Sequence, residues 1–357
     1  MTLATTGLSP FPPELFLVLA ASLLLWSRVH RVLLRLMAWC CFEWGAFRAA
    51  LALATLLEWL PLAAPMRARL WREKLYAHSA LGHTGTAVAG ARRLAVHAKA
   101  DGCLLCATCV VNLFINAGLY LEALDIERSW QGPSEPELLP VERDEWTMVR
   151  FNLVEAVYNL GGWGAASARL SALEEAARTY PFLWNFFPVQ RAWILAHTGR
   201  GEEALAALEN VDRQRVNRVY RSEVHFTRAA ALLALGRYEE AEREARRGSR
   251  LARRVSSTRN GLFLLGRITM AAGRLEEALR FFEAGATHPY KGQGGDGLLA
   301  WGDCLARLGR QEEAREAWGL VLARDAQSGA ASEAASRLGL HERRPATSAD
   351  LNRAAGA

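Results

Sequence analysis

Leu235-Gly236-Arg237-Tyr238-Glu239-Glu240-Ala241 decides the fold, because the spacing of its glycine and alanine recurs along the chain. The alanine follows the glycine by five residues in seven places. Successive glycines stand 36, 43, 38, 37, 37 and 36 residues apart. A period of this size is typical of stacked supersecondary units. The seven pairs are Gly82/Ala87, Gly118/Ala123, Gly161/Ala166, Gly199/Ala204, Gly236/Ala241, Gly273/Ala278 and Gly309/Ala314.

A helical stretch stands on each side of every glycine. The stretch before it has apolar residues at helical spacing, as in Trp193-Ile194-Leu195. The stretch after it is rich in Ala, Leu, Glu and Arg, which are strong helix formers. The glycine supplies the positive φ that ends the first helix, and the alanine is small because two helices cross there. The predicted unit is an antiparallel helix pair, and the predicted fold class is all-α.

These positions resemble the tetratricopeptide repeat (TPR) family over residues 68 to 340. The resemblance implies a right-handed superhelical solenoid of about seven TPR-like helix pairs, in which the first helix of each pair lines a concave groove. The period exceeds the family's 34 residues by two or three per copy, which predicts longer turns between repeats. Further matches are Ala192, Ala229, Gly266 and Gly302, seven before the glycine, and Tyr120, Trp163 and Tyr238, two after it. Thr84, Gly201, Leu275 and Gln311 stand where an aromatic residue is usual.

The composition fits a helical protein without catalytic chemistry. Hydrophobic residues make up 51% and charged residues 22%, with a net charge of +6, which is ordinary for a soluble helical protein with some extra apolar content. The bias toward Ala, Leu, Arg and Glu indicates a bacterial source. The chain has no G-x-S-x-G, no H-E-x-x-H and no phosphate-binding glycine loop. We therefore expect neither enzyme activity nor a cofactor.

Two apolar stretches precede the repeats. Leu15–Ser27 is an uncharged run of 13 residues, shorter than the roughly 20 that a bilayer crossing needs, and arginines follow it. Leu36–Leu60 is apolar but carries three charges. We interpret these stretches as one or two hydrophobic helices that anchor the chain in a bacterial inner membrane, with the repeat array in the cytoplasm. The alternative is a cytoplasmic protein in which the helices pack as a cap on the solenoid.

Prolines and polar segments suggest the boundaries. Pro61 and Pro65 separate an N-terminal region, 1–65, from the repeat array, 66–340, and a polar tail, 341–357, is expected to be disordered. The one irregular spacing coincides with Gln131–Glu145, which we interpret as an exposed loop between repeats. Ser328–Leu338 is predicted to be a closing helix that seals the end of the stack.

Two sets of residues could carry chemistry outside the groove. The triplet Cys103, Cys106 and Cys109 has a spacing familiar from metal sites, but no fourth cysteine follows it, and core packing is the favoured interpretation. A metal-binding or redox protein is the alternative. A basic series from Arg243 to Arg254 is interleaved with glutamates, which favours a solvated face with ion pairs over an anionic lipid partner. Nucleic acid is not expected, because no aromatic residues alternate with the arginines.

The groove carries the functional prediction. In the resembled family, inward positions lie 13, 10, 6 and 3 residues before the turn glycine, which implies a groove that is apolar and aromatic here and suits an amphipathic helix or an extended apolar peptide. We expect that the stack does not require aromatic residues at these positions, since its clearest predicted tight crossings use Ala and Gly. We expect a protein-binding scaffold or assembly factor tethered to the membrane, or else a soluble adaptor or regulatory module. The predicted partner-binding residues are Phe151, Glu155, Tyr158, Phe186, Val189, Trp193, Phe226, Leu233, Phe263, Arg267 and Met270; the same offsets also give Met148, Ala196, Glu223, Ala230 and Asn260.

Overall fold

The computed structural model describes residues 29, 32–38, 40–41, 45–59, 62, 64–100, 103–130, 137–209, 211–212, 216–290, 292 and 294–340. Every regular element in these ranges is a helix, so the all-α prediction is confirmed, and consecutive helices pack as a helical-repeat solenoid. The pairs are α3 (Ala64–Ala80) with α4 (Thr84–Ala100), α5 (Leu104–Asn116) with α6 (Tyr120–Arg128), α7 (Pro140–Asn159) with α8 (Trp163–Ala172) and the short α9 (Glu174–Thr179), α10 (Pro181–His197) with α11 (Gly201–Glu209), α12 (Arg221–Ala234) with α13 (Tyr238–Leu251), α14 (Val255–Ala271) with α15 (Leu275–Thr287), and α16 (Gly295–Arg307) with α17 (Gln311–Arg324).

The seven glycine and alanine pairs do what their spacing predicts. All seven turn glycines have positive φ, between 72° and 91°, a region that residues with a Cβ rarely adopt. The seven alanines are at most 2% exposed, because the two helices of each pair cross over them. Each repeat is therefore ended and packed by residues that lie within its own helix pair.

Small residues seven before the turn glycine let rings from the second helix of the same repeat pack closely. A Cβ built on Gly266 in α14 would lie 2.6 Å from Cε1 of Phe282 in α15. One built on Gly302 in α16 would lie 2.4 Å from Cδ1 of Trp318 in α17. Both rings are buried, so these glycines are required by packing rather than by backbone conformation.

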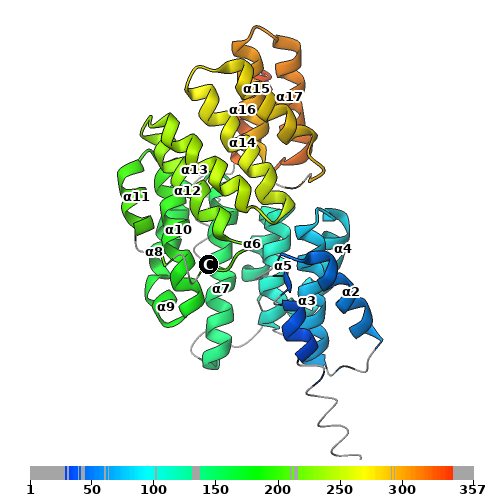
Figure 1. The fold of residues 1–357 in the computed structure, drawn as a ribbon. Helices are drawn as coiled ribbons and strands as arrows, with labels where there is room; N and C mark the ends of the chain where they lie inside the picture. Colours follow the sequence, from blue (N-terminus) through cyan, green and yellow to red (C-terminus); the bar gives the residue numbers. More distant parts are fainter. Residues whose placement is uncertain are drawn as a thin grey trace, which may run out of the picture.

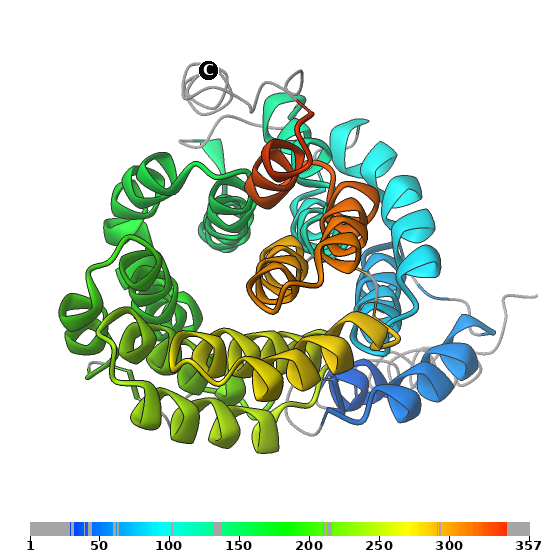
Figure 2. The same cartoon turned by 90° about the horizontal axis from the view of Figure 1, so that it is seen from above.

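The solenoid closes on itself after one superhelical turn. Figure 1 shows α14–α17 stacked above the remaining helices, and Figure 2 shows the helices running round a ring. Tyr76 and Tyr220 share a hydrogen bond of 3.1 Å although 144 residues separate them. The Tyr290 hydroxyl donates to the carbonyl oxygen of Asn116 at the end of α5. These contacts join the first repeats to the fifth and sixth.

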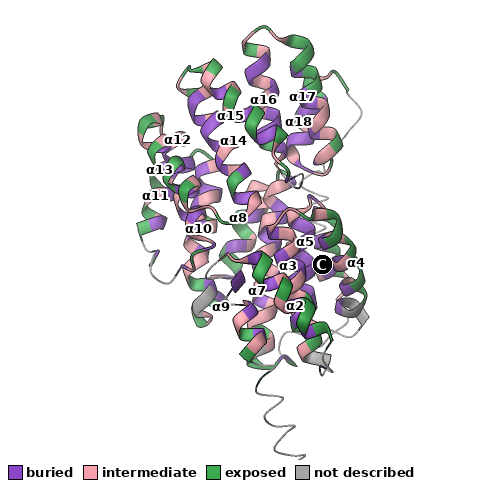
Figure 3. Cartoon of the chain, turned by 45° about the vertical axis from the view of Figure 1, so that its right-hand side comes forward, coloured by how far each residue is buried: buried purple, intermediate pink, exposed green. Residues whose placement is uncertain are grey.

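The described chain before the first repeat adds a helical stretch at residues 32–38 and one further helix to the solenoid. α2 (Phe47–Glu58) packs against α3 within a shared hydrophobic cluster, and Figure 3 shows both buried and exposed residues along it. Leu56 of this helix and its C-cap residue Trp59 are exposed. No helix in the described ranges is long and apolar enough to cross a membrane. The prediction of an inner-membrane location is therefore wrong, and α2 instead packs as the cap interpretation expected. The run Leu15–Ser27 lies outside the described residues.

The predicted loop between repeats is shorter than expected, whereas the predicted closing helix is present. The predicted loop between the second and third repeats ends earlier than expected, because α7 already begins at Pro140. Proline suits this first helical position, and the Glu142 carboxylate accepts from the Leu139 amide at 2.8 Å. The closing helix is confirmed as α18 (Gly329–Arg337), whose N-cap Ser328 accepts from the Ala331 amide. Residues 131–136 and 341–357 lie outside the described chain.

Candidate ligand-binding cavity

One cavity of about 600 Å³ occupies the centre of the superhelical turn. The first helix of every repeat contributes to its wall, namely α3, α5, α7, α10, α12, α14 and α16, and the segment before α18 completes it. A volume of this size is typical of sites for small ligands and peptide segments. Because the turn closes on itself, what sequence analysis expected as an open groove is surrounded by protein on its sides.

Most of the predicted groove residues reach this cavity. Leu233 and Met270 do not. They are half-buried and pack against hydrophobic clusters that join their own repeat to the next one. The predicted residues that line the cavity are Phe151, Glu155, Tyr158, Phe186, Val189, Trp193, Phe226, Phe263 and Arg267, together with Met148, Glu223 and Asn260.

Two of the aromatic residues that line the cavity mainly fill space between helices. Phe263 is 4% exposed, and a Cβ on Gly285 or Gly297 would lie 2.6 Å or less from its ring. Phe226 sits in the same way between Gly248 and Gly261, one repeat earlier. The expectation that the stack needs no aromatics at these positions is therefore wrong. A ring ten residues before the turn glycine fills the gap that two glycines leave.

Sequence analysis missed the polar part of the wall. It applied the inward offsets to the third through sixth repeats only, whereas the same offsets in the first, second and seventh repeats also reach the cavity. The position nine before the glycine was not among the predicted inward positions. It is rotated by only 100° about the helix axis from the position ten before the glycine, so it also faces the cavity. The lining residues missed at the inward offsets are Arg72, Tyr76, Thr108, Asn112, Ile115 and Asp296, and those nine before the glycine are Cys109, Asn152, Gln190, Thr227 and Leu264.

An aromatic ladder stiffens one side of the cavity. Tyr158 stacks on Trp163 with centroids 5.2 Å apart, Trp163 stacks on His197 at 4.9 Å, and His197 lies 4.2 Å from Trp193. The His197 Nδ1 atom lies 2.9 Å from the Trp193 carbonyl oxygen. Burial, together with the charge of nearby Arg267, lowers the pKa of His197 to about 3, so the ring is neutral at neutral pH. Tyr158 and Trp193 thus present rigid rings to the cavity.

A charged cluster forms another part of the wall. Arg254 forms an ion pair of 2.8 Å with Glu223, and its guanidinium lies 4.7 Å above the Tyr220 ring. Ser257 donates to the same carboxylate at 2.6 Å. Tyr220 is also the partner of Tyr76 across the closure, so this cluster joins the ring contact to the cavity wall. Its positive and negative charges compensate one another.

The upper end of the cavity is acidic. Asp296 presents its accessible surface to the cavity, and the protein that encloses the cavity desolvates its carboxyl and raises the pKa, while Arg267 opposes that rise. Asp325 is 3% exposed. One of its oxygens accepts from the Gly295 amide at 2.8 Å, and the other has no hydrogen-bond partner among the described residues. The wall as a whole carries five acidic and three basic side chains, on a chain whose net charge is +6.

The three cysteines of the triplet do not act together. Cys109 lines the cavity, its Sγ donates to the Arg72 carbonyl at 3.9 Å, and burial raises its pKa to about 12. Cys103 and Cys106 instead face each other, with their Sγ atoms 2.9 Å apart. Among the residues that the structure describes, no three metal-ligating side chains gather into a site.

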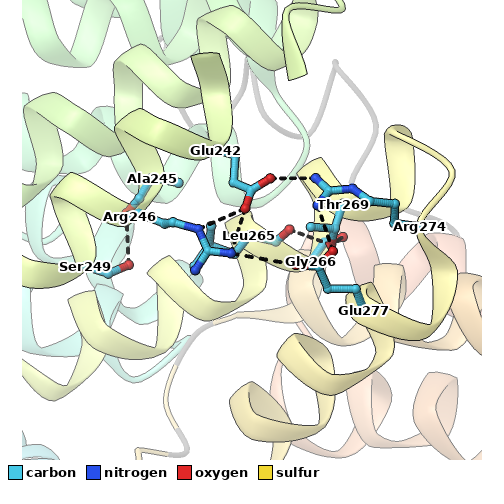
Figure 4. Close-up of polar contacts among 9 residues, drawn as sticks. All are labelled: Glu242, Ala245, Arg246, Ser249, Leu265, Gly266, Thr269, Arg274 and Glu277. Atoms are coloured by element: carbon cyan, nitrogen blue, oxygen red, sulfur yellow. Dashed lines mark hydrogen bonds and ion pairs between the residues drawn. The ribbon is translucent and has the colours of Figure 1, made fainter. Parts of the chain in front are cut away.

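Most of the basic series lies on the outer helix α13, where Arg246 and Arg247 form ion pairs, as the solvated-face interpretation expected. Arg254 differs, because it is the N-cap residue of α14 and lines the cavity. Figure 4 shows Glu242 between two arginines, Arg246 at 2.6 Å and Arg274 of the next repeat at 2.5 Å. Arg274 also pairs with Glu277 at 2.7 Å. These pairs bridge α13 to α15 on the surface, where each contributes little to stability.

Comparison with known proteins supports the fold and leaves the ligand open. No protein-family model matches the chain, and no curated protein matches it. The crystal structure of a Rap protein complexed with competence and sporulation factor is similar to it, with a TM-score of 0.53 and 13% sequence identity over 81% of this chain and 85% of that one. The structure of Naa15/Naa10 bound to HypK-THB covers 91% of this chain and 70% of its own at 16% identity, with a TM-score of only 0.24. The first likeness shows a shared helical-repeat fold.

Proposed function

We propose that the protein binds an extended peptide segment of a partner protein inside the central cavity. One observation carries this proposal: the first helices of all seven repeats converge on a single cavity. An extended chain fits such a space because it presents side chains and main-chain amides along its whole length. A folded domain would first have to open the contacts that close the ring.

Unpaired polar atoms on the wall support a peptide ligand. Gln190 Oε1, Trp193 Nε1 and Asn217 Oδ1 are buried, line the cavity and have no hydrogen-bond partner among the described residues. Leaving a buried polar group unpaired costs about 1–3 kcal/mol. A peptide backbone carries one donor and one acceptor per residue, so it can satisfy the indole and both amide oxygens. A purely apolar ligand would leave them unpaired.

The charge of the wall favours a ligand with basic side chains. Arg254 and Glu223 are paired and compensate one another, so the balance of the wall rests on four other carboxylates against Arg72 and Arg267. Burial raises the pKa of the Tyr158 phenol, and carboxylates from three different repeats add to the rise. They belong to Glu155, Glu223 and Asp296. A basic peptide would complement this field, whereas an acidic one would be repelled.

A solved relative in fold gives limited support. The Rap protein of similar structure is in complex with competence and sporulation factor, so a solenoid of this shape can hold a ligand. At 13% identity its contacts do not transfer to this chain, and the proposal stands on the cavity. The identity of the bound peptide would distinguish two roles for the protein. A segment of a larger protein would indicate a scaffold, and a free signalling peptide would indicate a regulator.

Peptide selection tests the proposal. Immobilised full-length protein is incubated with a library of acetylated, amidated random hexapeptides, and the retained peptides are sequenced. We expect enrichment of Arg and Lys and depletion of Asp and Glu. Trp193→Ala should then weaken a selected peptide by about 2 kcal/mol, or roughly 30-fold in Kd, because a rigid ring on the wall is lost.

A second tryptophan of α10 provides the control. Trp184 is 42% exposed and does not line the cavity, so Trp184→Ala should leave Kd within about twofold. Melting temperatures of both variants are measured beside the affinities. The proposal fails if the library yields no retained peptide, or if Trp184→Ala weakens binding as much as Trp193→Ala does.

A further inference from the structure

Two cysteines outside the cavity wall meet at the start of α5. Cys103 is the N-cap residue of this helix, with extended backbone angles of φ −80° and ψ 94°, and Cys106 lies in its first turn. Their Sγ atoms are 2.9 Å apart. Cys106 is 4% exposed, whereas Cys103 is only half-buried and can be reached from solvent. The pair therefore combines close approach with access from one side.

We propose that Cys103 and Cys106 are a redox-active dithiol that closes reversibly to a disulfide. The oxidant is a small-molecule disulfide such as oxidised dithiothreitol or oxidised glutathione. The Cys103 thiolate attacks one sulfur of that disulfide and displaces the other sulfur as a thiolate. The Cys106 thiolate then attacks Cys103 Sγ and releases the second half of the oxidant. Two protein thiols are oxidised, one small disulfide is reduced to two thiols, and the two protons pass to those thiols.

The local backbone makes this closure feasible. A disulfide needs the two sulfurs at about 2.05 Å, so they must approach by about 0.9 Å from where they stand. Residues three apart at a helix start lie within reach of each other, and the extended N-cap frees Cys103 from helical angles. The amides of the first turn have no intrahelical acceptor and favour a thiolate beside them. Cys103 is therefore the attacking residue.

The third cysteine of the triplet serves as the internal comparison. Cys109 is 6% exposed, its Sγ is engaged with the Arg72 carbonyl, and burial raises its pKa to about 12. A thiol with so high a pKa is almost entirely protonated near neutral pH and is a poor nucleophile. The spacing C-x-x-C-x-x-C is thus split by the fold into a reactive pair and an inert residue.

A redox titration of the full-length protein tests the assignment. The protein is equilibrated in buffers of graded reduced and oxidised dithiothreitol, quenched with acid, denatured, alkylated with a maleimide and analysed by intact mass and peptide mapping. We expect the wild type to lose two alkylatable thiols in one two-electron transition, about 30 mV per tenfold change. Mapping should show the linkage between Cys103 and Cys106.

Matched variants locate the pair. Cys109→Ser should titrate like the wild type, whereas Cys103→Ser and Cys106→Ser should lose the two-electron transition while their circular dichroism stays helical. Peptide mapping of the wild type gives the linkage even if a variant is unstable. The proposal is overturned if the native wild type keeps every thiol at the oxidising limit, or if the lost thiols map to any other pair.

Discussion

Gly266→Ala is the sharpest test of how the repeats pack. Gly266 lies in the interior of α14, where a new Cβ would stand 2.6 Å from Cε1 of Phe282, against 3.4–4 Å for an ordinary contact. The Phe282 ring is 0% exposed, so it must move by about 0.8 Å inside a filled core. Overpacking of this kind costs about 1–3 kcal/mol. Alanine recovers up to about 1 kcal/mol of helix propensity. We expect net destabilisation of up to about 2 kcal/mol.

Gly319→Ala is the matched control, because Gly319 lies in the interior of α17 with nothing within 4 Å of its virtual Cβ. It should gain the helix propensity without the clash and stabilise the protein by about 0.5–1 kcal/mol. Urea denaturation followed by circular dichroism measures both. Hydrogen exchange of α14 and α15 adds local resolution, since repeat arrays need not unfold in two states. Shifts of the same sign in the two variants would refute the packing argument.

Two further predictions concern burial and closure. Because burial lowers the pKa of His197 to about 3 while an unfolded histidine titrates near 6.5, stability should fall as pH drops from 6.5 toward 3, by up to about 3 kcal/mol at pH 4. Urea melts of His197→Phe should lose this part of the slope and those of the exposed His83→Phe should keep it; equal slopes in all three proteins would contradict the assignment. Tyr290→Phe removes the hydroxyl that donates to the Asn116 carbonyl, which should cost about 1 kcal/mol and reduce hydrogen-exchange protection at the end of α5. Unchanged exchange there would mean that this contact does not help to close the ring.

The cavity wall shows where reasoning from sequence succeeds and where it stops. The inward offsets predict that Tyr158, Trp193 and Arg267 face inward, and all three line the cavity, because side-chain direction along a helix follows from its period. They do not separate a ligand-facing ring from a packing ring. Phe226 and Phe263 occupy equivalent offsets and fill gaps beside glycines of neighbouring helices. That distinction depends on how far apart those helices stand, which no residue within one repeat determines.

The helix pairs could be predicted from the sequence because residues within each pair determine where its helices end and cross. A turn such as Gly236 with positive φ and a buried crossing residue such as Ala241 lie five positions apart, and every repeat restates the pattern. Only the tertiary structure decided that the solenoid closes and that its interior is acidic. Closure brings Tyr76 to Tyr220 and Asn116 to Tyr290, across 144 and 174 residues. It results from small rotations added over many repeats, and these depend on packing between helix pairs rather than on any single turn.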